Sequence, residues 1–371
     1  MAKVTIVGGG PAGLIVALTL RDAGVDVVVV ERSGYTGYRV GEHITPEGVL
    51  LLSAFGLGAE ALAAGGHRRT HGVRSAWGDG EFARTDYCFH PTGCGFNLLR
   101  PAFDVALAEA TRQRGATVWT GATLAGARRS GDGWALEVVA GDGGHHCLQA
   151  DVVVDAGGRR APFARGQGAI IHVLDHQIAM ISFLARGTGV SLPPEDTVLV
   201  ETAESGWWYF ALLGEASAVC MFVTDPDLVR AGAAGRTWSF AAELAKTRHV
   251  SPLVAAYDER RQVLVRSART QLLWPVCGAG WIATGDAAMA FDPLSSGGIA
   301  KALRYGPIVG ATVLGQLAGD GDAAGRYGAR VLDDFKTYLE ARMGYYLLEQ
   351  RWRNAPFWRR RFAALAEPEG V

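Results

Sequence analysis

The chain has 371 residues, of which 49% are hydrophobic and 20% are charged, and its formal net charge is −1. This composition predicts a compact globular protein with a sizeable core, and the small net charge excludes an overall field that attracts nucleic acid or an anionic membrane. Five scattered cysteines without a C-x-x-C pair, an N-terminus that leads straight into an apolar run, and no apolar stretch of membrane-spanning length favour a cytoplasmic protein without signal peptide, metal site or membrane span.

A glycine-rich turn near the N-terminus is the first informative feature. Residues 4–7 are predicted as a short buried strand, and a second apolar strand, residues 25–30, ends on Glu31. An apolar helix is expected between them, after a turn that consists of Gly8, Gly9, Gly10, Pro11, Ala12 and Gly13. This order of strand, G-x-G-x-x-G turn, helix, strand and acid is the fingerprint of a dinucleotide-binding site.

Each part of the fingerprint has a physical role. Gly8 allows the tight turn, Gly10 lets the backbone approach a pyrophosphate, and Gly13 lets helix and strand pack closely. The helix N-terminus offers free N–H groups to the anion. Glu31 can accept hydrogen bonds from both ribose hydroxyls, which argues against a 2′-phosphate and leaves NAD or the ADP half of FAD.

The predicted elements continue in chain order to residue 165. A Gly- and Tyr-rich loop at 33–42 precedes a helix expected from Pro46, and residues 65–98 suit strands and loops of a second layer. Arg100 opens the next helix. The strands expected after that helix cover residues 117–124, 134–139 and 145–154.

A second sheet is expected in the middle of the chain. Its strands alternate in β fashion and cover residues 177–184, 197–201, 207–213 and 218–223. A helix at about 238–248 follows, and then a short strand that leads to Asp286. Beyond Gly297 the sequence is typical of helices, with Pro307 expected to kink the first of them.

A carboxylate after that short strand indicates a second part of the cofactor site. Asp286 follows an apolar run, and the segment from Asp292 to Ile299 contains a Gly-rich helix start. Such a carboxylate can bind the ribityl hydroxyls of a flavin, while the helix N–H groups face the flavin pyrimidine or the pyrophosphate. The alternative is an ordinary strand–turn–helix in which Asp286 caps the helix. Together with the N-terminal fingerprint, the pattern favours FAD.

The predicted fold class is therefore α/β. We expect a Rossmann-type FAD-binding fold with an inserted antiparallel β-sheet substrate domain and a helical C-terminus. The expected FAD-binding part covers residues 1–165, with 275–320 returning to it. The substrate-binding sheet covers 166–274, and the C-terminal helices cover 321–371.

The motifs and their order resemble those of the FAD-dependent monooxygenases of the para-hydroxybenzoate hydroxylase superfamily. Besides the fingerprint and Arg100, they include Asp155-Ala156-Gly157-Gly158-Arg159, Gly285-Asp286 and Asp292-Pro293. The resemblance implies that Arg100 lies near the flavin phosphate or ribose, Asp286 at the ribityl chain, and residues 292–298 near the isoalloxazine. The FAD contacts expected on this basis are Gly8, Gly10, Pro11, Ala12, Gly13, Glu31, Arg32, Gly41, Glu42, Arg100, Asp155, Gly157, Gly285, Asp286, Pro293, Gly297, Gly298 and Ile299.

Within that superfamily the chain is similar to the flavin-dependent halogenase-like branch, and most similar to flavoproteins that hydroxylate a protein tryptophan to build quinone cofactors. The similar segments are Gly41 to Pro46, Ser205 to Tyr209, Tyr345-Tyr346, Glu349 to Trp352 and Phe357 to Arg360. The W-x-W-x-I-P segment of halogenases is missing. No lysine lies between Lys3 and Lys246, where the halogenase lysine would fall, so halogenation is not expected.

The resemblance implies a monooxygenase that hydroxylates an electron-rich aromatic substrate through a flavin C4a-hydroperoxide. A tryptophan indole, free or protein-bound, is the candidate substrate. The superfamily's Asp-Gly pair reads Asp155-Ala156 here, which leaves NAD(P)H or a separate flavin reductase as the electron donor.

Hydroxylation needs a dry aromatic pocket and a base near the attacked ring. Trp208, in the aromatic segment 207–210, is expected at the substrate pocket, with packing in the sheet core as the alternative. His43 is the candidate catalytic base, followed by His172 and His176. For each histidine a purely structural role is the alternative.

The C-terminal residues 351–362 interleave arginines with aromatics. They can dock a protein, a membrane surface or RNA, but we favour an amphipathic helix that packs on the flavin domain with its arginines solvated or paired. Two other functions stay open. One is a flavin-dependent reductase (saturase) of isoprenoid double bonds, in which segment 207–210 lines a lipid tunnel. The other is a non-catalytic, FAD-stabilised maturation factor that holds a partner protein through Arg359, Arg360 and Arg361.

Overall fold

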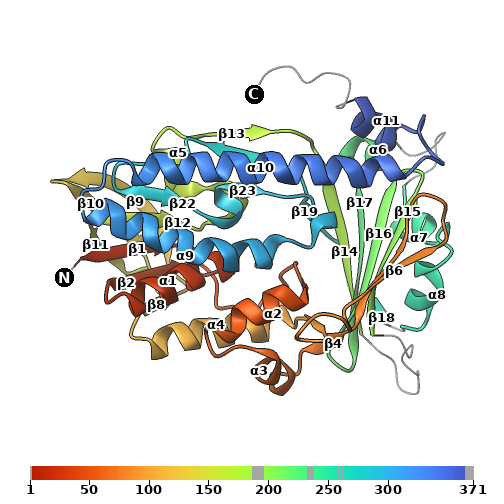
Figure 1. Ribbon diagram of the computed structural model, residues 1–371, viewed down its shortest axis with the longest axis horizontal. Helices are drawn as coiled ribbons and strands as arrows, with labels where there is room; N and C mark the ends of the chain where they lie inside the picture. The colour runs from red at the N-terminus through yellow and green to blue at the C-terminus, as the bar shows by residue number, and fades with distance from the viewer. Residues whose placement is uncertain (1, 186–195, 232–237, 258, 261, 364–371) are drawn as a thin grey trace.

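The structure is a computed structural model that describes residues 2–185, 196–231, 238–257, 259–260 and 262–363. A six-stranded sheet forms its nucleotide-binding half (Figure 1). The strand order is β21 (Cys277–Gly278), β22 (Trp281–Ala283), β12 (Val152–Asp155), β1 (Lys3–Val7), β2 (Asp26–Glu31) and β8 (Thr117–Thr120). All neighbours pair in parallel except β21 and β22. The inner strands are almost continuous runs of valine and isoleucine, because both faces of the sheet are covered.

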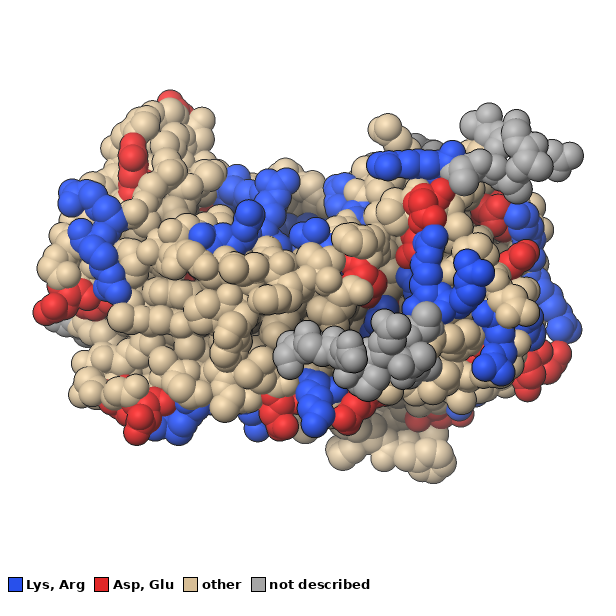
Figure 2. Space-filling view, turned by 90° about the horizontal axis from the view of Figure 1, so that it is seen from above, with Lys and Arg blue, Asp and Glu red and all other residues tan. Residues whose placement is uncertain are grey.

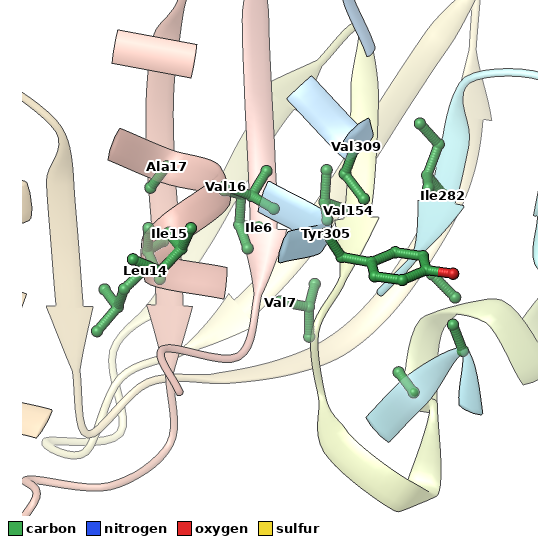
Figure 3. Close-up of a cluster of buried hydrophobic side chains, with 14 of the residues drawn as sticks. Ile6, Val7, Leu14, Ile15, Val16, Ala17, Val154, Ile282, Tyr305 and Val309 are labelled. Carbon is green, nitrogen blue, oxygen red and sulfur yellow. The ribbon is translucent and has the colours of Figure 1, made fainter. Parts of the chain in front are cut away.

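Helices α1 (Pro11–Asp22) and α9 (Gly298–Leu317) pack against this sheet and against each other. Figure 3 shows Ile15 of α1 and Val309 of α9 in one apolar cluster with strand residues. Added Cβ atoms at Gly306 and Gly310 would lie only 2.3 Å from Ile15 and 2.7 Å from Thr19, so glycine allows the close approach. Helix α9 continues through Pro307 to Leu317.

A larger sheet forms the other half. Its order is β18 (Glu259–Arg260), β14 (Ile178–Ala185), β17 (Ser217–Thr224), β16 (Gly206–Leu213), β15 (Thr197–Ala203), β5 (Gly72–Ala76) and β6 (Phe82–Asp86), and β19 (Leu264–Ser267) also pairs with β14. The strands predicted at 177–223 all lie in this sheet. However, β5 and β6 come from within residues 1–165, and β5 runs parallel to β15. The sheet is therefore not wholly antiparallel, because no hairpin constrains two strands so distant in sequence.

Among the described residues after β17, three short helices follow in the chain: α6 (Pro226–Ala231), α7 (Phe240–Leu244) and α8 (Val250–Ala255). The single helix predicted at 238–248 is wrong, since α7 ends at Leu244 and α8 begins at Val250. The reason is Glu201 on β15, whose buried carboxylate accepts hydrogen bonds from the N–H groups of Arg248, His249 and Val250. These bonds fix the start of α8.

Three smaller sheets and several short helices complete the fold of the described residues. The sheets are β9 (Thr123–Ser130), β10 (Gly133–Val139) and β11 (His145–Ala150); β13 (Ile170–Val173), β20 (Gln271–Trp274) and β23 (Met289–Ala290); and β3 (His43–Ile44), β7 (Gly95–Asn97) and β4 (Arg68–Thr70). The sheet of β9, β10 and β11 lies at the end of the molecule away from the larger sheet (Figure 1). The short helices and turns are α2 (Pro46–Ser53), α3 (Ala59–Ala64), η1 (Gly158–Arg160), α5 (Pro162–Gly166), η3 (Gly285–Ala287) and η4 (Pro293–Ser295). The predicted strands at 117–124 and 145–154 are each two strands. Gly121, with φ of +70°, makes the first break.

Helix α4 (Arg100–Gln113) lies beside α1. The C-terminal helix α10 (Ala323–Leu348) joins both halves, because it runs along the length of the molecule from the nucleotide-binding sheet to the larger sheet (Figure 1). Helix α11 (Pro356–Ala363) follows it there. Figure 2 shows basic and acidic side chains interspersed at the end that carries α11. Within the described ranges no helix is both long and apolar enough to cross a membrane.

Candidate functional site

The glycine turn between β1 and α1 has the geometry that a pyrophosphate needs. Gly8 has a φ of +109°, and a Cβ there would lie 2.2 Å from the carbonyl oxygen of Ala156, so the turn is tight against the end of β12. A Cβ at Gly13 would lie 2.0 Å from the Gly8 carbonyl oxygen, but a Cβ at Gly10 would meet no protein atom within 4 Å. This open space lies at the start of α1, which has no side-chain cap and no acid in its first turn, so it fits the anionic part of FAD.

Glu31, at the end of β2, is buried beside this turn. Its Oε2 accepts a hydrogen bond from the Gly9 N–H at 2.7 Å, and its Oε1 accepts from Ser33 and, at 2.8 Å, from Arg39. Burial raises the pKa of Glu31, but the Ser33 hydrogen bond and the Arg39 charge outweigh it, so the net pKa is lowered. Glu31 is thus a carboxylate held at the turn, whereas the adjacent Arg32 is exposed.

A chain of ion pairs runs from β2 to α4. Arg39 also contacts Asp104, with an Nη1–Oδ2 distance of 3.2 Å. Arg100, at the first position of α4, contacts both carboxylate oxygens of Asp104 at 3.2 Å and donates to the Gly41 carbonyl oxygen at 3.2 Å. In this structure Arg100 therefore holds the loop that carries Gly41, whose φ is +91°.

Asp155, at the end of β12, is buried under the glycine turn. Its two oxygens accept hydrogen bonds from the N–H groups of Gly157 at 2.9 Å and Ala164 at 2.8 Å. Burial raises the pKa of Asp155 to about 6, although these N–H groups oppose the rise. A Cβ at Gly157 would lie 2.4 Å from Pro162. Asp155 and Gly157 thus fix the backbone that follows β12, directly behind the glycine turn.

Asp286 lies in η3, after β22, at the carboxyl end of the parallel strands. The Nζ of Lys301 lies 3.0 Å from its Oδ1, and the Nε of Arg159 lies 3.6 Å from its Oδ2. Partial burial raises the pKa of Asp286, whose side chain is 39% exposed, but the charges of Lys301 and Arg159 outweigh it and leave the pKa lowered. Lys301 is 2% exposed and lies 4.2 Å from the ring centroid of Phe291. A carboxylate at this place fits the ribityl chain of FAD.

Glycines bring the two helix starts to the same edge of the sheet. Gly285 has a φ of +61°, and a Cβ there would lie 2.6 Å from the Cβ of Ala12 in α1. Helix α9 begins at Gly298 after Gly297, and a Cβ at Gly298 would meet no protein atom within 4 Å. Ile299, the next residue, is buried in the core. Both helix N-termini therefore face the carboxyl ends of the strands, where doubly wound folds bind ligands.

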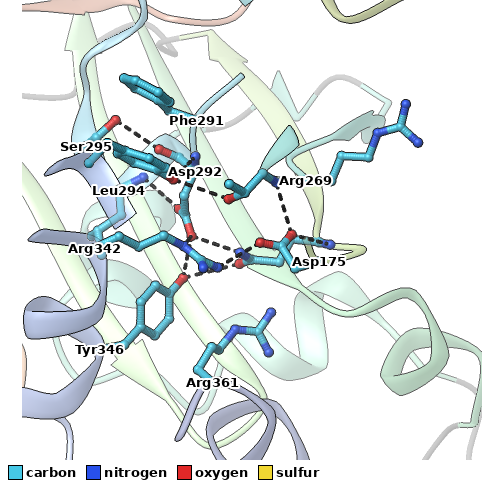
Figure 4. Close-up of polar contacts among 12 residues, drawn as sticks. Asp175, Arg269, Phe291, Asp292, Leu294, Ser295, Arg342, Tyr346 and Arg361 are labelled. Carbon is cyan, nitrogen blue, oxygen red and sulfur yellow. Dashed lines mark hydrogen bonds and ion pairs between the residues drawn. The ribbon is translucent and has the colours of Figure 1, made fainter. Parts of the chain in front are cut away.

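The segment before α9 is held by α10 (Figure 4). Oδ2 of the buried Asp292 accepts hydrogen bonds from Gln177 and Tyr346, each at 2.8 Å, and from Nε of Arg342 at 3.1 Å. Pro293 opens η4 directly after it. Burial raises the pKa of Asp292, but Arg342 and the hydrogen bonds outweigh it and lower the pKa. This carboxylate therefore joins α10 to the segment predicted near the isoalloxazine.

His43, the candidate base, is buried on β3 with both ring nitrogens in use. Its Nδ1 lies 3.0 Å from the Oδ1 of Asn97, and its Nε2 lies 2.9 Å from the hydroxyl of Tyr87. Burial lowers the pKa of His43 to about 4, so the ring is neutral near pH 7. His172 and His176, the other candidates, are exposed.

Glu42, next to His43, is buried in a different environment. Its Oε2 accepts a hydrogen bond from Gly41 at 3.1 Å, and its Oε1 has no hydrogen-bond partner. Burial raises the pKa of Glu42 to about 7, although the Arg100 charge opposes the rise. Glu42 lines a cavity of about 310 Å³ between the two halves of the molecule. Other walls of the cavity include Tyr38, Arg39, Arg100, Phe183 and Leu213.

The aromatic segment of β16 divides between the two faces of the larger sheet. Trp207 and Tyr209 pack with the C-terminal residues Tyr346 and Trp358, whereas Trp208 packs with Phe222 and residues of α7 and α8. Trp208 is fully buried there, and its ring lies 4.6 Å from that of Phe222. Trp208 therefore faces away from the nucleotide-binding half and belongs to the sheet core. The same packing gives segment 207–210 the role of a core rather than a tunnel wall.

The C-terminal stretch packs on the larger sheet, not on the flavin domain as we predicted. Trp358 is fully buried there, because the aromatic side of α11 continues the apolar face of β16. Arg361 is buried and paired with Asp225, and Arg360 contacts both Asp225 and Asp227. Arg360 and Arg361 are thus paired, in agreement with the favoured interpretation, whereas Arg359 is exposed.

Comparison with known proteins identifies the family. Residues 1–303 match the model of the FAD binding domain family. The chain belongs to this family. It is an FAD-dependent oxidoreductase of the monooxygenase and halogenase superfamily, with the fold that the motifs predicted.

Several relatives cover most of the chain. LodB of Marinomonas mediterranea, named as an FAD-dependent oxidoreductase, is 28% identical over 360 residues, which are 96% of each chain. The tryptophan 2-halogenase of Chondromyces crocatus is 26% identical over 87% of this chain and 63% of its own. Among solved structures, the flavin-dependent halogenase CmlS has a TM-score of 0.85 at 25% identity, covering 98% of this chain and 69% of its own. The peptidyl tryptophan dihydroxylase QhpG, essential for tryptophylquinone cofactor biogenesis, has a TM-score of 0.76 at 25% identity, covering 97% and 78%.

Several site residues were not anticipated from the sequence. Lys301 stands one turn into α9 on its buried side, and its rarity as one of four lysines was the only signal. Asn97 and Tyr87 support His43, but they lie in a region read only as strands and loops. Tyr346 reaches Asp292 from 54 residues away, which no local pattern indicates. Within the described residues no three His, Cys, Asp or Glu side chains gather as a metal site requires.

Proposed function

We propose that this protein hydroxylates an electron-rich aromatic ring, with a tryptophan indole, free or protein-bound, as the candidate substrate. Molecular oxygen and two electrons from a reductant supply the reaction. One oxygen atom enters the ring, and the other leaves as water with two protons. The likeness to QhpG, a peptidyl tryptophan dihydroxylase, supports this class of substrate. The reductant is NAD(P)H or a separate flavin reductase.

The observation that carries hydroxylation over halogenation is the set of cations at the cavity beside Glu42. The halogenases that this chain resembles use an active-site lysine, but the cations lining this cavity are Arg39 and Arg100. The four lysines of the chain are elsewhere. Lys3, Lys246 and Lys336 are exposed, and Lys301 is buried against Asp286. An arginine stays protonated and cannot take over the chemistry of a lysine amine.

The residues of the site divide the work. FAD, when bound, supplies the oxygen chemistry. The start of α1 at Gly10 would hold its pyrophosphate, Asp286 its ribityl hydroxyls, and the start of α9 at Gly298 its ring end. Phe183 and Leu213 of the larger sheet offer the apolar walls that exclude water around the substrate ring.

The test is product analysis under ¹⁸O₂. The FAD-loaded protein is reduced with light and a sacrificial donor, then mixed with ¹⁸O₂ and N-acetyl-tryptophanamide in the presence of chloride and bromide. We expect a product that carries one ¹⁸O atom. A chlorinated or brominated product instead would replace hydroxylation by halogenation, and unchanged amide with full flavin reoxidation would overturn the proposal for this class of ring. Protein without FAD is the matched control.

A further inference from the structure

Lys301 is a cation in an unfavourable place. It is the fourth residue of α9, a helix that has no acid in its first turn. A positive charge there meets the positive end of the helix dipole, which is destabilising. The side chain is also only 2% exposed, and lysines are almost never buried so deeply unless they are paired. Sequences break local rules of this kind mainly at functional sites, so Lys301 is a candidate for a role in the cofactor site.

Three groups surround the Lys301 ammonium. Its Nζ atom donates to Oδ1 of Asp286 at 3.0 Å and to the carbonyl oxygen of Met289, and it lies 4.2 Å from the ring centroid of Phe291. A carboxylate, a carbonyl and the face of an aromatic ring all attract an ammonium, which has three protons. Burial lowers the pKa of Lys301, but the Asp286 charge opposes this effect. These contacts use all three protons, so Lys301 acts on a ligand only through its partners.

The partners of Lys301 belong to two segments that are predicted to lie at the flavin. Asp286 is in η3, and Phe291 leads into the segment from Asp292 to Gly298. The ring of Phe291 stacks on that of Tyr338 in α10, with 3.9 Å between the ring centroids and 8° between the ring planes. Lys301 therefore connects the start of α9 to both segments.

The Asp286 carboxylate is held by cations and is still open to a ligand. Its Oδ1 contacts Lys301 and its Oδ2 lies 3.6 Å from Nε of Arg159, yet the side chain remains 39% exposed. The preceding Gly285 lies against Ala12 of α1, so Asp286 stands where α1 and α9 begin. An ionised carboxylate accepts several hydrogen bonds, and hydroxyl groups can donate them. Its remaining acceptor positions therefore suit the ribityl hydroxyls of FAD.

We propose that Lys301 is a positioning residue of the cofactor site, whose ammonium holds the Asp286 carboxylate ionised and in one orientation to accept the ribityl hydroxyls of FAD. This role rests on the proposed function, which assigns Asp286 to the ribityl chain, and deepens it by naming the group that orients the carboxylate. A preoriented acceptor strengthens binding, because its side chain loses no rotational freedom when the ligand arrives. Lys301 thereby contributes to FAD affinity without contacting FAD.

The experiment compares two ligands that share the ADP group. Binding of FAD and of ADP to the full-length apoprotein is measured by calorimetry near neutral pH. ADP has no ribityl chain, so both ligands use the turn at Gly10 but only FAD reaches Asp286. We expect Lys301→Met to weaken FAD binding about tenfold, since it removes a fixed hydrogen-bond acceptor, and to leave ADP binding unchanged. Lys336→Met, which replaces an exposed lysine of α10, is the matched control and should bind both ligands as wild type does.

A double mutant shows whether Lys301 acts through Asp286. Asp286→Asn should itself weaken FAD binding, because an amide has only one acceptor atom for hydroxyl groups. Adding Lys301→Met to Asp286→Asn should then cost no further FAD affinity, since the effects of residues that act as one unit do not add. An equal loss from Lys301→Met in both backgrounds would show an effect independent of Asp286 and overturn the inference. An equal loss for FAD and ADP, or unchanged FAD affinity in Lys301→Met, would overturn it too.

The role of Lys301 and the proposed function fail separately. Unchanged FAD affinity in Asp286→Asn would overturn the assignment of Asp286 to the ribityl chain, and the role of Lys301 with it. Hydroxylation is judged by the ¹⁸O product of the wild type. An FAD-selective loss in Lys301→Met without that product would retain the role of Lys301 and reject hydroxylation. The ¹⁸O product together with unchanged FAD affinity in Lys301→Met would do the reverse.

Discussion

The Nδ1 atom of His43 lies 3.0 Å from the Oδ1 atom of Asn97, and this contact determines the tautomer of the imidazole. Because an amide oxygen only accepts, Nδ1 carries the proton and Nε2 accepts from Tyr87. His43 is thereby occupied in joining β3 to the strands around it. The adjacent Glu42 is the group with acceptor capacity to spare.

His43→Gln should keep activity within about threefold of wild type, because a group that transfers no proton in the reaction does not contribute the roughly 10²- to 10⁴-fold of a general base. The measurement is ¹⁸O product formed per bound FAD from N-acetyl-tryptophanamide. A hundredfold loss in His43→Gln with full FAD content would restore His43 as the base.

Two glycines of the fingerprint should respond differently to alanine. Gly10→Ala adds a Cβ that meets no protein atom, so the unfolding of the apoprotein should be unchanged. FAD binding should weaken at least about tenfold, because the methyl group enters the pyrophosphate space. Gly13→Ala places its Cβ 2.0 Å from the Gly8 carbonyl oxygen and should destabilise the apoprotein itself by about 1–3 kcal/mol.

Urea unfolding of the two apoproteins and fluorescence titration with FAD check this contrast. Similar unfolding midpoints for both variants would show that the turn can accommodate a Cβ at Gly13. Unchanged FAD affinity in Gly10→Ala would move the pyrophosphate away from α1.

Loss of Asp286 should lower the free energy of unfolding more than loss of its partner Lys301. Lys301 is 2% exposed, so Asp286→Asn leaves a buried ammonium without its carboxylate and should cost about 3 kcal/mol. The Asp286 side chain is 39% exposed and keeps Arg159, so Lys301→Met should cost less than about 1 kcal/mol. Urea unfolding of the apoproteins measures both. Equal losses would mean that the ammonium finds another partner.

Glu42 should make the protein less stable as the pH rises. Its pKa is raised from 4.5 to about 7, so its contribution to stability is fully present below pH 4.5 and is lost as the pH rises through 7. We expect the free energy of unfolding of Glu42→Gln, relative to wild type, to increase over this range by on the order of 3 kcal/mol. The difference between the two proteins cancels the titration of other groups. A difference independent of pH would show that Glu42 ionises freely.

The contribution of Asp225 to stability should depend on pH in the direction opposite to that of Glu42: it should be lost as the pH falls. Burial raises its pKa, but Arg361 and Arg360 outweigh it, so the pKa is lowered below 3.8. The stabilisation is present above pH 3.8 and is lost as the pH falls through the lower folded value. Asp225→Asn should cost about 3 kcal/mol at pH 7, because it leaves the guanidinium of Arg361 buried without a counter-ion. Urea unfolding at pH 7 and at pH 3 measures both effects. A variant as stable as wild type at pH 7 would contradict this reading of α11.

The local parts of the fold were predictable from sequence, and the distant pairings were not. The glycine turn, the end of β2 at Glu31 and the start of α4 at Arg100 follow from short-range rules of turns and helix starts. Alternation in β16 predicted two faces but not which face turns towards the nucleotide-binding half, so Trp208 was expected at the substrate pocket although it packs in the sheet core with Phe222. Only the arrangement of α10 beside η4 brings Tyr346 to Asp292.

The Asp292 carboxylate has a mechanical consequence. It accepts hydrogen bonds from Gln177 before β14 and from Arg342 and Tyr346 on α10, so one buried group binds the segment before α9 to both halves. A hinge between the halves would have to break these bonds together, and each bond to a charged group contributes about 1.5–3 kcal/mol. The two halves should therefore move as one rigid body.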